Sequence, residues 1–149
     1  MMVSKDSMPP HAGAKSQILL VEEDGSVRAS LQRVLQSENY TVAAVGSTAG
    51  ARQVLRDQHV DLVLMDVDSP DHDGWTAAKE IAATAMFLPI VLITAKTGQQ
   101  MRAAMTGADV LMEKPLSFPA LVQTMKQLLE QSLEGRQHRL DETYSQVAA

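Results

Sequence analysis

The chain has 149 residues and a net charge of −5, so its length suits one compact domain and its acidic balance disfavours nucleic acid or an anionic membrane as a direct partner. It contains no apolar run long enough to span a bilayer. It also contains no cysteine, which excludes disulfides and thiol-ligated metals and is consistent with a cytoplasmic setting.

The two ends of the chain lack the patterning of the middle. Residues 1–16 combine proline, glycine and serine without the apolar segment of a secretory signal, and we interpret them as a disordered N-terminal extension. Residues 17–134 carry the regular patterning and are predicted to form one domain. Residues 135–149 are predicted to be a polar C-terminal tail or the stub of a linker.

The first half of the domain alternates short apolar runs with amphipathic segments. Residues 18–21 are a buried strand that ends in acids, and apolar residues at helical spacing over 27–35 predict a helix. Residues 40–45 are a second strand, and Ser47 is a good N-cap for the helix that follows. The third strand is the apolar run that ends at Asp66.

The second half continues this alternation. Its predicted elements are a helix over 75–83, a strand over 88–94, a short, weakly apolar helix over 98–105, a strand over 110–112 and a strongly amphipathic helix over 121–133. Gly107 suits a left-handed helix C-cap. Five near-continuous apolar strands alternating with five helices predict an α/β fold, a doubly wound parallel sheet with helices on both faces. Because aromatics make up only 3% of the chain, we expect an aliphatic core with methionine as filler.

Reactive side chains follow four of the five strands. Glu22 and Glu23 follow the first strand, Asp66 ends the third, Thr94 ends the fourth, and Lys114 comes just after the fifth. Since the strands are predicted to be parallel, all these ends lie on one edge of the sheet, where chemistry sits in open α/β folds. This placement is the strongest functional signal in the sequence.

The chemistry of these groups is complementary. Carboxylates gathered at one edge repel one another and favour a cation, and oxygen ligands of this kind suit Mg²⁺. A metal ion and the Lys114 ammonium would neutralise an incoming phosphoryl group, and Thr94 offers it a hydroxyl. Asp66 could then attack phosphorus and form an acyl phosphate.

Five segments of the chain resemble the receiver domain of two-component response regulators, and the likeness covers roughly residues 17–134. Each segment alone is weak, but five in order at the expected strand ends are highly specific. They are Ile18–Asp24 with Val27-Arg28, Asp61–Asp66 with Pro70 and Asp73-Gly74, Leu88–Ala95, Gly107–Asp109, and Lys114-Pro115.

The resemblance implies a flavodoxin-like sheet of strand order 2-1-3-4-5 and a role for each site residue. Asp66 would accept phosphate from a sensor histidine kinase or phosphotransfer protein, as a switch that phosphorylates and dephosphorylates itself rather than a turnover enzyme. Thr94 and Lys114 would grip the phosphoryl group and couple it to a downstream protein partner through the face of the fourth helix, fifth strand and fifth helix. That last helix could also support a homodimer. The predicted Mg²⁺ ligands are Glu22, Glu23, Asp66 and the backbone carbonyl of Asp68.

Two positions depart from the family pattern. Glu23 stands where the family usually has Asp as the direct metal ligand, and its extra methylene predicts weaker Mg²⁺ binding or binding through a water. A register shifted by one would make Asp24 the ligand, but Val27-Arg28 fits the first register better. Leu111 replaces the usual Tyr or Phe switch, so output must travel by loop or helix shifts.

Two other functions remain open at this point. One is a degenerate receiver that binds a partner without being phosphorylated, and the departures at Glu23 and Leu111 suggest it. A Mg²⁺ dissociation constant far above the cellular Mg²⁺ concentration would favour it over the phosphorylatable switch. A haloacid-dehalogenase-type phosphatase is motivated by Asp66-Val67-Asp68, which matches that class's Asp-x-Asp signature. Such enzymes, however, carry their metal-binding acid pair downstream of the signature, whereas this chain has it upstream.

Overall fold

The computed structural model describes residues 15–68 and 74–131. The predicted N-terminal extension up to residue 14, the loop residues Pro70 and Asp73, and the predicted C-terminal tail lie outside the described residues. None of the helices in the described ranges is long and apolar enough to cross a membrane.

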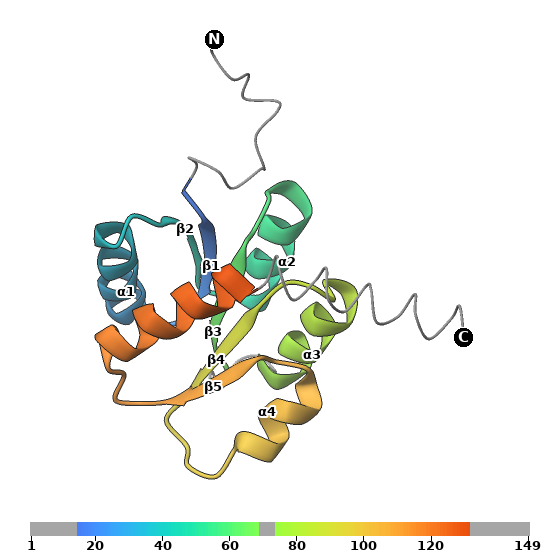
Figure 1. Ribbon diagram of the computed structural model, residues 1–149. Coiled ribbons are helices and arrows are strands. Elements are labelled where there is room, and N and C mark those ends of the chain that lie inside the picture. The colour runs from blue at the N-terminus through green and yellow to red at the C-terminus, as the bar shows by residue number, and fades with distance from the viewer. Residues whose placement is uncertain (1–14, 69–73, 132–149) are drawn as a thin grey trace.

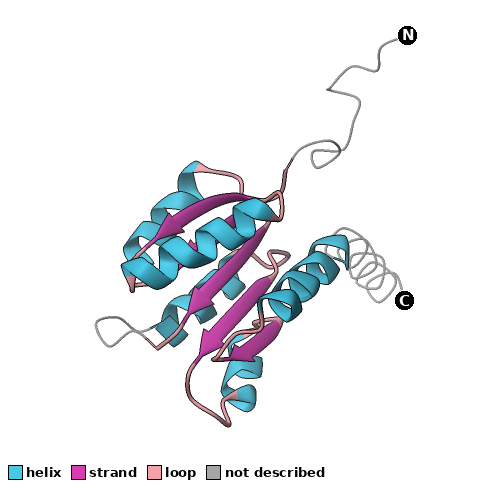
Figure 2. Cartoon of the chain, turned by 90° about the vertical axis from the view of Figure 1, so that its left-hand side faces the viewer, coloured by secondary structure: helices cyan, strands magenta, loops and turns pink. Residues whose placement is uncertain are grey.

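The centre of the fold is a five-stranded parallel sheet in the order β2-β1-β3-β4-β5, as predicted. Its strands are β1 (Gln17–Val21), β2 (Thr41–Val45), β3 (Leu62–Asp66), β4 (Ile90–Thr94) and β5 (Val110–Glu113). In Figure 2 the arrowheads of the strands point the same way, so their carboxyl ends gather at one edge. The register keeps these ends level, because Asp66 pairs with Ile93 and Thr94 with Glu113.

Helices cover both faces of the sheet, which confirms the doubly wound architecture (Figure 1). Four of them are α1 (Gly25–Ser37), α2 (Thr48–Asp57), α3 (Gly74–Thr84) and α4 (Gln100–Thr106), and the C-terminal helix is described over 118–131. One buried apolar cluster joins the sheet to α1 and the C-terminal helix, and the other joins it to α2, α3 and α4. The core is therefore two-layered, as burial of the strands on both faces requires.

The alternation of side chains along each strand decides which face a site residue takes. Leu64 packs in the cluster beneath α1 and the C-terminal helix, and Leu92 packs in the cluster beneath α3 and α4. Because side chains two positions apart share a face, Asp66 follows Leu64 onto the first side and Thr94 follows Leu92 onto the second. The acceptor candidate and the hydroxyl thus approach the sheet edge from opposite faces.

The fourth helix is shorter than its sequence pattern predicts. It begins at Gln100 rather than 98, because Gly98 lies in a left-handed conformation at φ 73°. It ends as predicted at Gly107, whose φ of 88° is the left-handed geometry that glycine adopts at low cost.

The expectation that methionine fills the core is wrong for three residues. Met65 and Met125 are fully buried, but Met86, Met101 and Met105 are more than 70% exposed. Met101 and Met105 lie one turn apart on α4, a helix with only seven residues. Such a short helix buries Ala103 and Thr106 against the sheet and leaves its long side chains outside.

Candidate functional site

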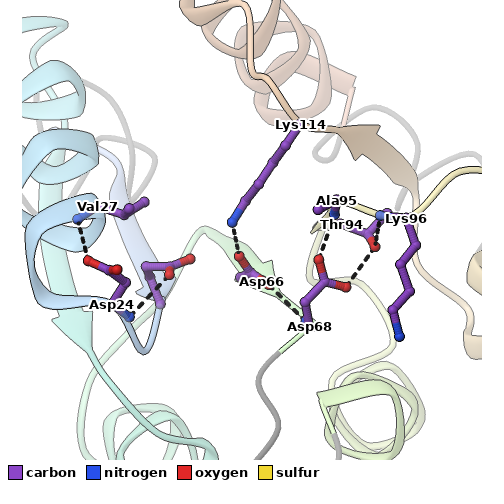
Figure 3. A network of polar contacts seen from close by, with 9 residues as sticks. Asp24, Val27, Asp66, Asp68, Thr94, Ala95, Lys96 and Lys114 are labelled. Atoms are coloured by element: carbon purple, nitrogen blue, oxygen red, sulfur yellow. Dashed lines mark hydrogen bonds and ion pairs between the residues drawn. The ribbon is translucent and has the colours of Figure 1, made fainter.

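Asp66 lies at the centre of the site, at the last position of β3 (Figure 3). Its residue is only 8% exposed. One carboxylate oxygen, Oδ2, contacts the Lys114 ammonium at 2.5 Å, and the other, Oδ1, accepts a hydrogen bond from the Asp68 backbone N–H at 2.8 Å. The two oxygens are therefore held by different parts of the chain, which fixes the orientation of the carboxylate.

The contacts of Asp66 keep it ionised. Burial alone would raise its pKa, but hydrogen bonding to Lys114, to Glu22 and to the Asp68 N–H outweighs burial and holds the pKa of Asp66 below its usual range. The same contact raises the pKa of Lys114, although burial opposes it. At neutral pH the site thus holds a carboxylate and an ammonium in contact.

Glu22 brings a second buried carboxylate to this edge from the end of β1. Its Oε1 accepts the Asp24 backbone N–H at 3.2 Å, whereas its Oε2 is buried without a hydrogen-bond donor in the described part of the chain. Burial, then hydrogen bonding to Asp66 and the charge of Asp66, raise the pKa of Glu22 to about 7. With one proton on the pair, its single negative charge is matched by the Lys114 ammonium, and when both carboxyls are ionised the pair carries one negative charge more than Lys114 supplies.

This orphaned oxygen suits a hard cation. Mg²⁺ prefers one or two carboxylates and keeps several waters, and it could take the place of the proton that Glu22 holds. Across residues 15–68 and 74–131, no three acidic, histidine or cysteine side chains are already gathered as a metal site. Glu23, the predicted direct ligand, has an exposed side chain. The donor set therefore fits a metal completed by water and backbone oxygens, and the ligand roles of Glu23 and the Asp68 carbonyl stay predictions.

Arg28 stabilises the backbone of the acidic turn after β1 through hydrogen bonds. Its Nη1 donates to the backbone carbonyl of Glu22 at 2.8 Å and to that of Glu23 at 3.2 Å. The guanidinium also occupies the space above Gly46, where an added Cβ would lie 2.9 Å from Nη1. Arg28 thus fixes the backbone of the two predicted metal-binding residues.

Asp24 has a structural task that sequence reasoning left open. Its Oδ1 accepts the backbone N–H groups of Ser26 at 2.9 Å and Val27 at 3.1 Å, which makes it the N-cap of α1. The hydrogen bonds from Val27 and Ser26 lower the pKa of Asp24. This capping role favours the register in which Glu22 and Glu23, rather than Asp24, face the site.

The side chain of Asp68 joins the site in a way that the sequence prediction missed. Its Oδ1 accepts the Thr94 hydroxyl at 2.7 Å and its Oδ2 accepts the Ala95 N–H at 2.5 Å (Figure 3). Thr94 is fully buried, and its hydroxyl oxygen also accepts the Lys96 N–H at 3.1 Å. The available signal was the pairing of β3 with β4, which brings a carboxylate two residues after Asp66 next to a strand-end threonine.

Gly74 sets how closely α3 approaches the end of β3. A Cβ at this position would lie 2.8 Å from the Val67 Cα and 2.9 Å from the Val67 carbonyl oxygen. Since these are backbone atoms, a larger residue would have to push the two segments apart. Glycine here therefore keeps the chain that carries Asp66 and Asp68 pressed against α3.

Leu111 lies on β5 and packs, partly buried, on the cluster beneath α3 and α4. On the same side of the sheet, the Arg102 guanidinium of α4 lies 4.5 Å from the ring centre of Trp75 in α3. Leu111 thus occupies the position where the family commonly has an aromatic switch. The Arg102–Trp75 cation–π contact links α4 to α3 on the same side of the sheet.

A cavity of about 340 Å³ opens beside the Asp66–Lys114 pair, between α1 and the segment that links β5 to the C-terminal helix. Its walls are mostly apolar and include Val27, Leu31, Leu116 and Phe118, with Glu22 and Lys114 at its polar end. The cavity therefore adjoins Glu22 and Lys114 from the α1 side of the sheet.

The protein has a flavodoxin-like sheet, and one edge of that sheet carries a buried aspartate, a neighbouring acid, a lysine and a threonine. This combination of fold and site is typical of phosphate-accepting receiver domains. The family model of the response regulator receiver domain matches residues 18–142. The chain therefore belongs to the receiver domain family of two-component response regulators. Because the receiver domain model covers the Asp66-Val67-Asp68 segment, that segment no longer supports a haloacid-dehalogenase-type phosphatase.

Curated relatives and solved structures agree with this assignment. The chain is 31% identical over 142 residues to the TorCAD operon transcriptional regulatory protein TorR of Escherichia coli (strain K12), covering 92% of this chain and 59% of TorR. It is 36% identical over 114 residues to the transcriptional regulatory protein ZraR of the same organism, covering 75% of this chain and 26% of ZraR. The chain thus spans less than two thirds of the length of TorR and about a quarter of the length of ZraR.

The fold likeness is close even where the sequence has diverged. The crystal structure of a CheY-like response regulator receiver domain protein from Methanospirillum hungatei JF-1 superposes with a TM-score of 0.77 at 19% identity. The match covers 82% of this chain and 99% of that one. It supports the arrangement of strands and helices, and the chemistry of the site rests on the residues described above.

Proposed function

We propose that this chain is a phosphorylatable signalling switch in which Asp66 accepts a phosphoryl group from a histidine kinase or phosphotransfer protein in a Mg²⁺-dependent reaction. The observation that carries the proposal is the Asp66 carboxylate itself. It is ionised although it is buried, it contacts the Lys114 ammonium at 2.5 Å, and it lies beside the orphaned oxygen of Glu22. Phosphoryl transfer requires a nucleophile and positive charge around the phosphoryl group. Asp66 is the nucleophile, Lys114 is one source of positive charge, and the Glu22 oxygen could bind a metal ion as the other.

The transfer step is a displacement at phosphorus. An oxygen of Asp66 forms a bond to phosphorus while the phosphorus–nitrogen bond of the donor phosphohistidine breaks. The electron pair stays on the imidazole nitrogen, which takes a proton from water. Lys114 neutralises the phosphoryl oxygens, and the Thr94 hydroxyl donates to one of them.

Glu22, Glu23 and Asp66 are the side chains that would hold Mg²⁺, which when bound supplies further positive charge at the phosphoryl oxygens. Their distribution supports a division of labour. Lys114 follows β5 and Thr94 ends β4 on one side of Asp66, and the two glutamates follow β1 on the other. The two kinds of positive charge would therefore act on the phosphoryl group from opposite directions.

The cavity beside Lys114 supports entry of the donor from the α1 side. Its apolar walls could seat the surface around a phosphohistidine while its polar end meets the phosphoryl group. Output would leave by the face of α4, β5 and the C-terminal helix, through which the domain would contact a downstream protein. With Leu111 in place of an aromatic, we propose that α4 itself moves, and that the Arg102–Trp75 contact changes with it.

The decisive test is the intact mass of the protein after treatment with acetyl phosphate, with and without Mg²⁺. We expect a gain of one phosphoryl group only with Mg²⁺, and none in Asp66→Asn, which keeps the shape but not the nucleophile. Equal labelling of Asp66→Asn and wild type would contradict Asp66 as the acceptor. The absence of labelling at millimolar Mg²⁺ would contradict the function.

The exposed side chain of Glu23 favours a second candidate, a degenerate receiver that binds its partner without being phosphorylated. In that case Mg²⁺ affinity would be far too weak for the cell, and partner binding would be the same for wild type and Asp66→Asn. A direct Mg²⁺ titration followed through Trp75, the single tryptophan, separates the two functions.

A further inference from the structure

Asp68 places a second carboxylate against hydrogen-bond donors at the end of β4. The Thr94 hydroxyl donates to its Oδ1 at 2.7 Å, and the Ala95 N–H donates to its Oδ2 at 2.5 Å. The Asp68 side chain is half-buried, and its backbone N–H meanwhile binds Asp66. Both oxygens of one anion are thus held by two converging donors, as Figure 3 shows.

These donors stand next to the proposed acceptor. Asp66 pairs in register with Ile93, so Thr94 and Ala95 come directly after its neighbour on β4. A phosphoryl group on Asp66 would extend past the end of β3 and would need donors on this side for the oxygens that Lys114 does not reach. Two donors that hold the two oxygens of a carboxylate are equally suited to two oxygens of a phosphoryl group.

We propose, on the premise that Asp66 is the phosphoacceptor, that Asp68 is a built-in competitor: in the unphosphorylated protein its carboxylate occupies the Thr94 and Ala95 donors that the phosphoryl group must take. Phosphorylation then requires the Asp68 side chain to leave them. Asp68 acts as a positioning residue, because it controls access to the donors and does not itself react.

Two physical effects make this competition costly. The phosphoryl group must break two hydrogen bonds to a charged acceptor, which are stronger than those to a neutral one. It also brings negative charge next to the negative charge of Asp68, at a position beside the buried Thr94 hydroxyl. Removing the charge of Asp68 should therefore speed phosphorylation and tighten binding of a phosphoryl mimic, each by about tenfold, which corresponds to about 1.4 kcal/mol.

The experiment compares wild type, Asp68→Asn and Asp68→Ala in two measurements with Mg²⁺. One is the initial rate of phosphorylation by subsaturating acetyl phosphate, followed by intact mass, and the other is the affinity for beryllofluoride. The matched control is Asp109→Asn. Asp109 also accepts a backbone N–H of β4, that of Ile90 at 2.8 Å, but Ile90 is the first residue of β4 and lies at the end of the strand away from the site. The control removes the same charge and should match wild type.

A spectroscopic measurement separates competition from a general change in the fold. In Asp68→Ala the Ala95 amide resonance should move, because it loses its acceptor, and beryllofluoride with Mg²⁺ should return it toward the wild-type position. Thermal unfolding shows whether each variant is folded. If Asp68→Asn is unfolded, the comparison of Asp68→Ala with wild type tests the proposal.

The outcomes separate this inference from the proposed function. If wild type is phosphorylated and neither Asp68 variant is faster or binds beryllofluoride more tightly, the competitor role is wrong and the phosphoacceptor stands. If no form is phosphorylated or binds beryllofluoride, both are wrong.

Discussion

Lys114, after β5, reaches across the end of β4 to contact Asp66 at the end of β3, with 2.5 Å between Nζ and Oδ2. The contact spans three neighbouring strands of the sheet. It also explains how a carboxylate that is only 8% exposed stays ionised, because burial alone would raise its pKa. Everything expected of the site depends on this pair.

Replacement of Lys114 by Ala should therefore damage both the chemistry and the fold. Without the ammonium, the pKa of Asp66 rises and phosphorylation by acetyl phosphate becomes slower by at least about tenfold. The unfolding free energy should fall by about 1 to 2 kcal/mol, a value reduced because Lys114 is one third exposed. Urea unfolding and intact mass measure the two effects.

The control for this change is Lys126→Ala. The Lys126 ammonium lies 3.8 Å from the Glu38 carboxylate, and both side chains are exposed. Pairs of this kind contribute only about 0 to 1 kcal/mol, so stability and phosphorylation should hardly change. Equal losses in the two variants would show that the Asp66 contact has no special role.

Glu22 predicts a pH dependence of stability without metal. Its pKa is about 7 in the folded protein against 4.5 ordinarily, so between these values the folded state binds more protons than the unfolded state. The stabilising contribution is complete below pH 4.5 and is lost as pH rises through 7. Asp66, whose pKa is lowered, acts only in more acidic solution. Stability should fall by about 1 to 3 kcal/mol across this window.

The measurement is urea unfolding of the metal-free protein from pH 5 to pH 8, with Glu22→Gln as the comparison. The variant should lose most of the slope, because its amide does not titrate. Added Mg²⁺ should restore stability more at pH 8 than at pH 5, since the metal competes with the proton. A rise in stability across this range in wild type would contradict the raised pKa.

Glu23→Asp tests the departure from the family pattern. If the extra methylene weakens metal binding, the shorter side chain should tighten Mg²⁺ binding by several-fold, because Mg²⁺ demands near-octahedral geometry. Isothermal titration or Trp75 fluorescence reports the affinity. Asp24→Ala is the comparison: it should lower the stability through the lost N-cap and leave Mg²⁺ affinity nearly unchanged. The reverse pattern would make Asp24 the ligand.

Gly74→Ala should force α3 away from the end of β3. The added Cβ meets the backbone of Val67 at 2.8 Å, so we expect a loss of about 1 to 3 kcal/mol and slower phosphorylation. Gly25→Ala is the control, because its Cβ would meet only the flexible end of Arg28, at 3.6 Å. Similar unfolding midpoints for both variants would contradict the close approach at Gly74.

The parts of the molecule that were predictable from sequence are those that local patterning decides. The apolar run before Asp66 could only be a strand buried on both faces, and the level ends of parallel strands then brought Lys114 to it. The position of the Asp68 side chain does not follow from local patterning, and only the predicted pairing of β3 with β4 hinted at it. Its conformation depends on Thr94 and Ala95, which lie far along the chain and become neighbours only through the pairing of β3 with β4.

Exposure of the methionines on α4 was unpredictable for a different reason. The sequence pattern around Met101 and Met105 is weakly apolar, and only the length of the helix decides which side chains reach the sheet. Since α4 has seven residues, its small side chains fill the contact and the long ones do not.

The reach of Lys114 across three strands also makes the site depend on an edge strand of the sheet. β5 is an edge strand of four residues, none of them fully buried. Fraying of this edge would carry Lys114 away while the inner strands stayed paired. The protein should therefore lose its capacity to be phosphorylated some degrees below the temperature at which it melts, so that the temperature range for signalling is narrower than the range for folding.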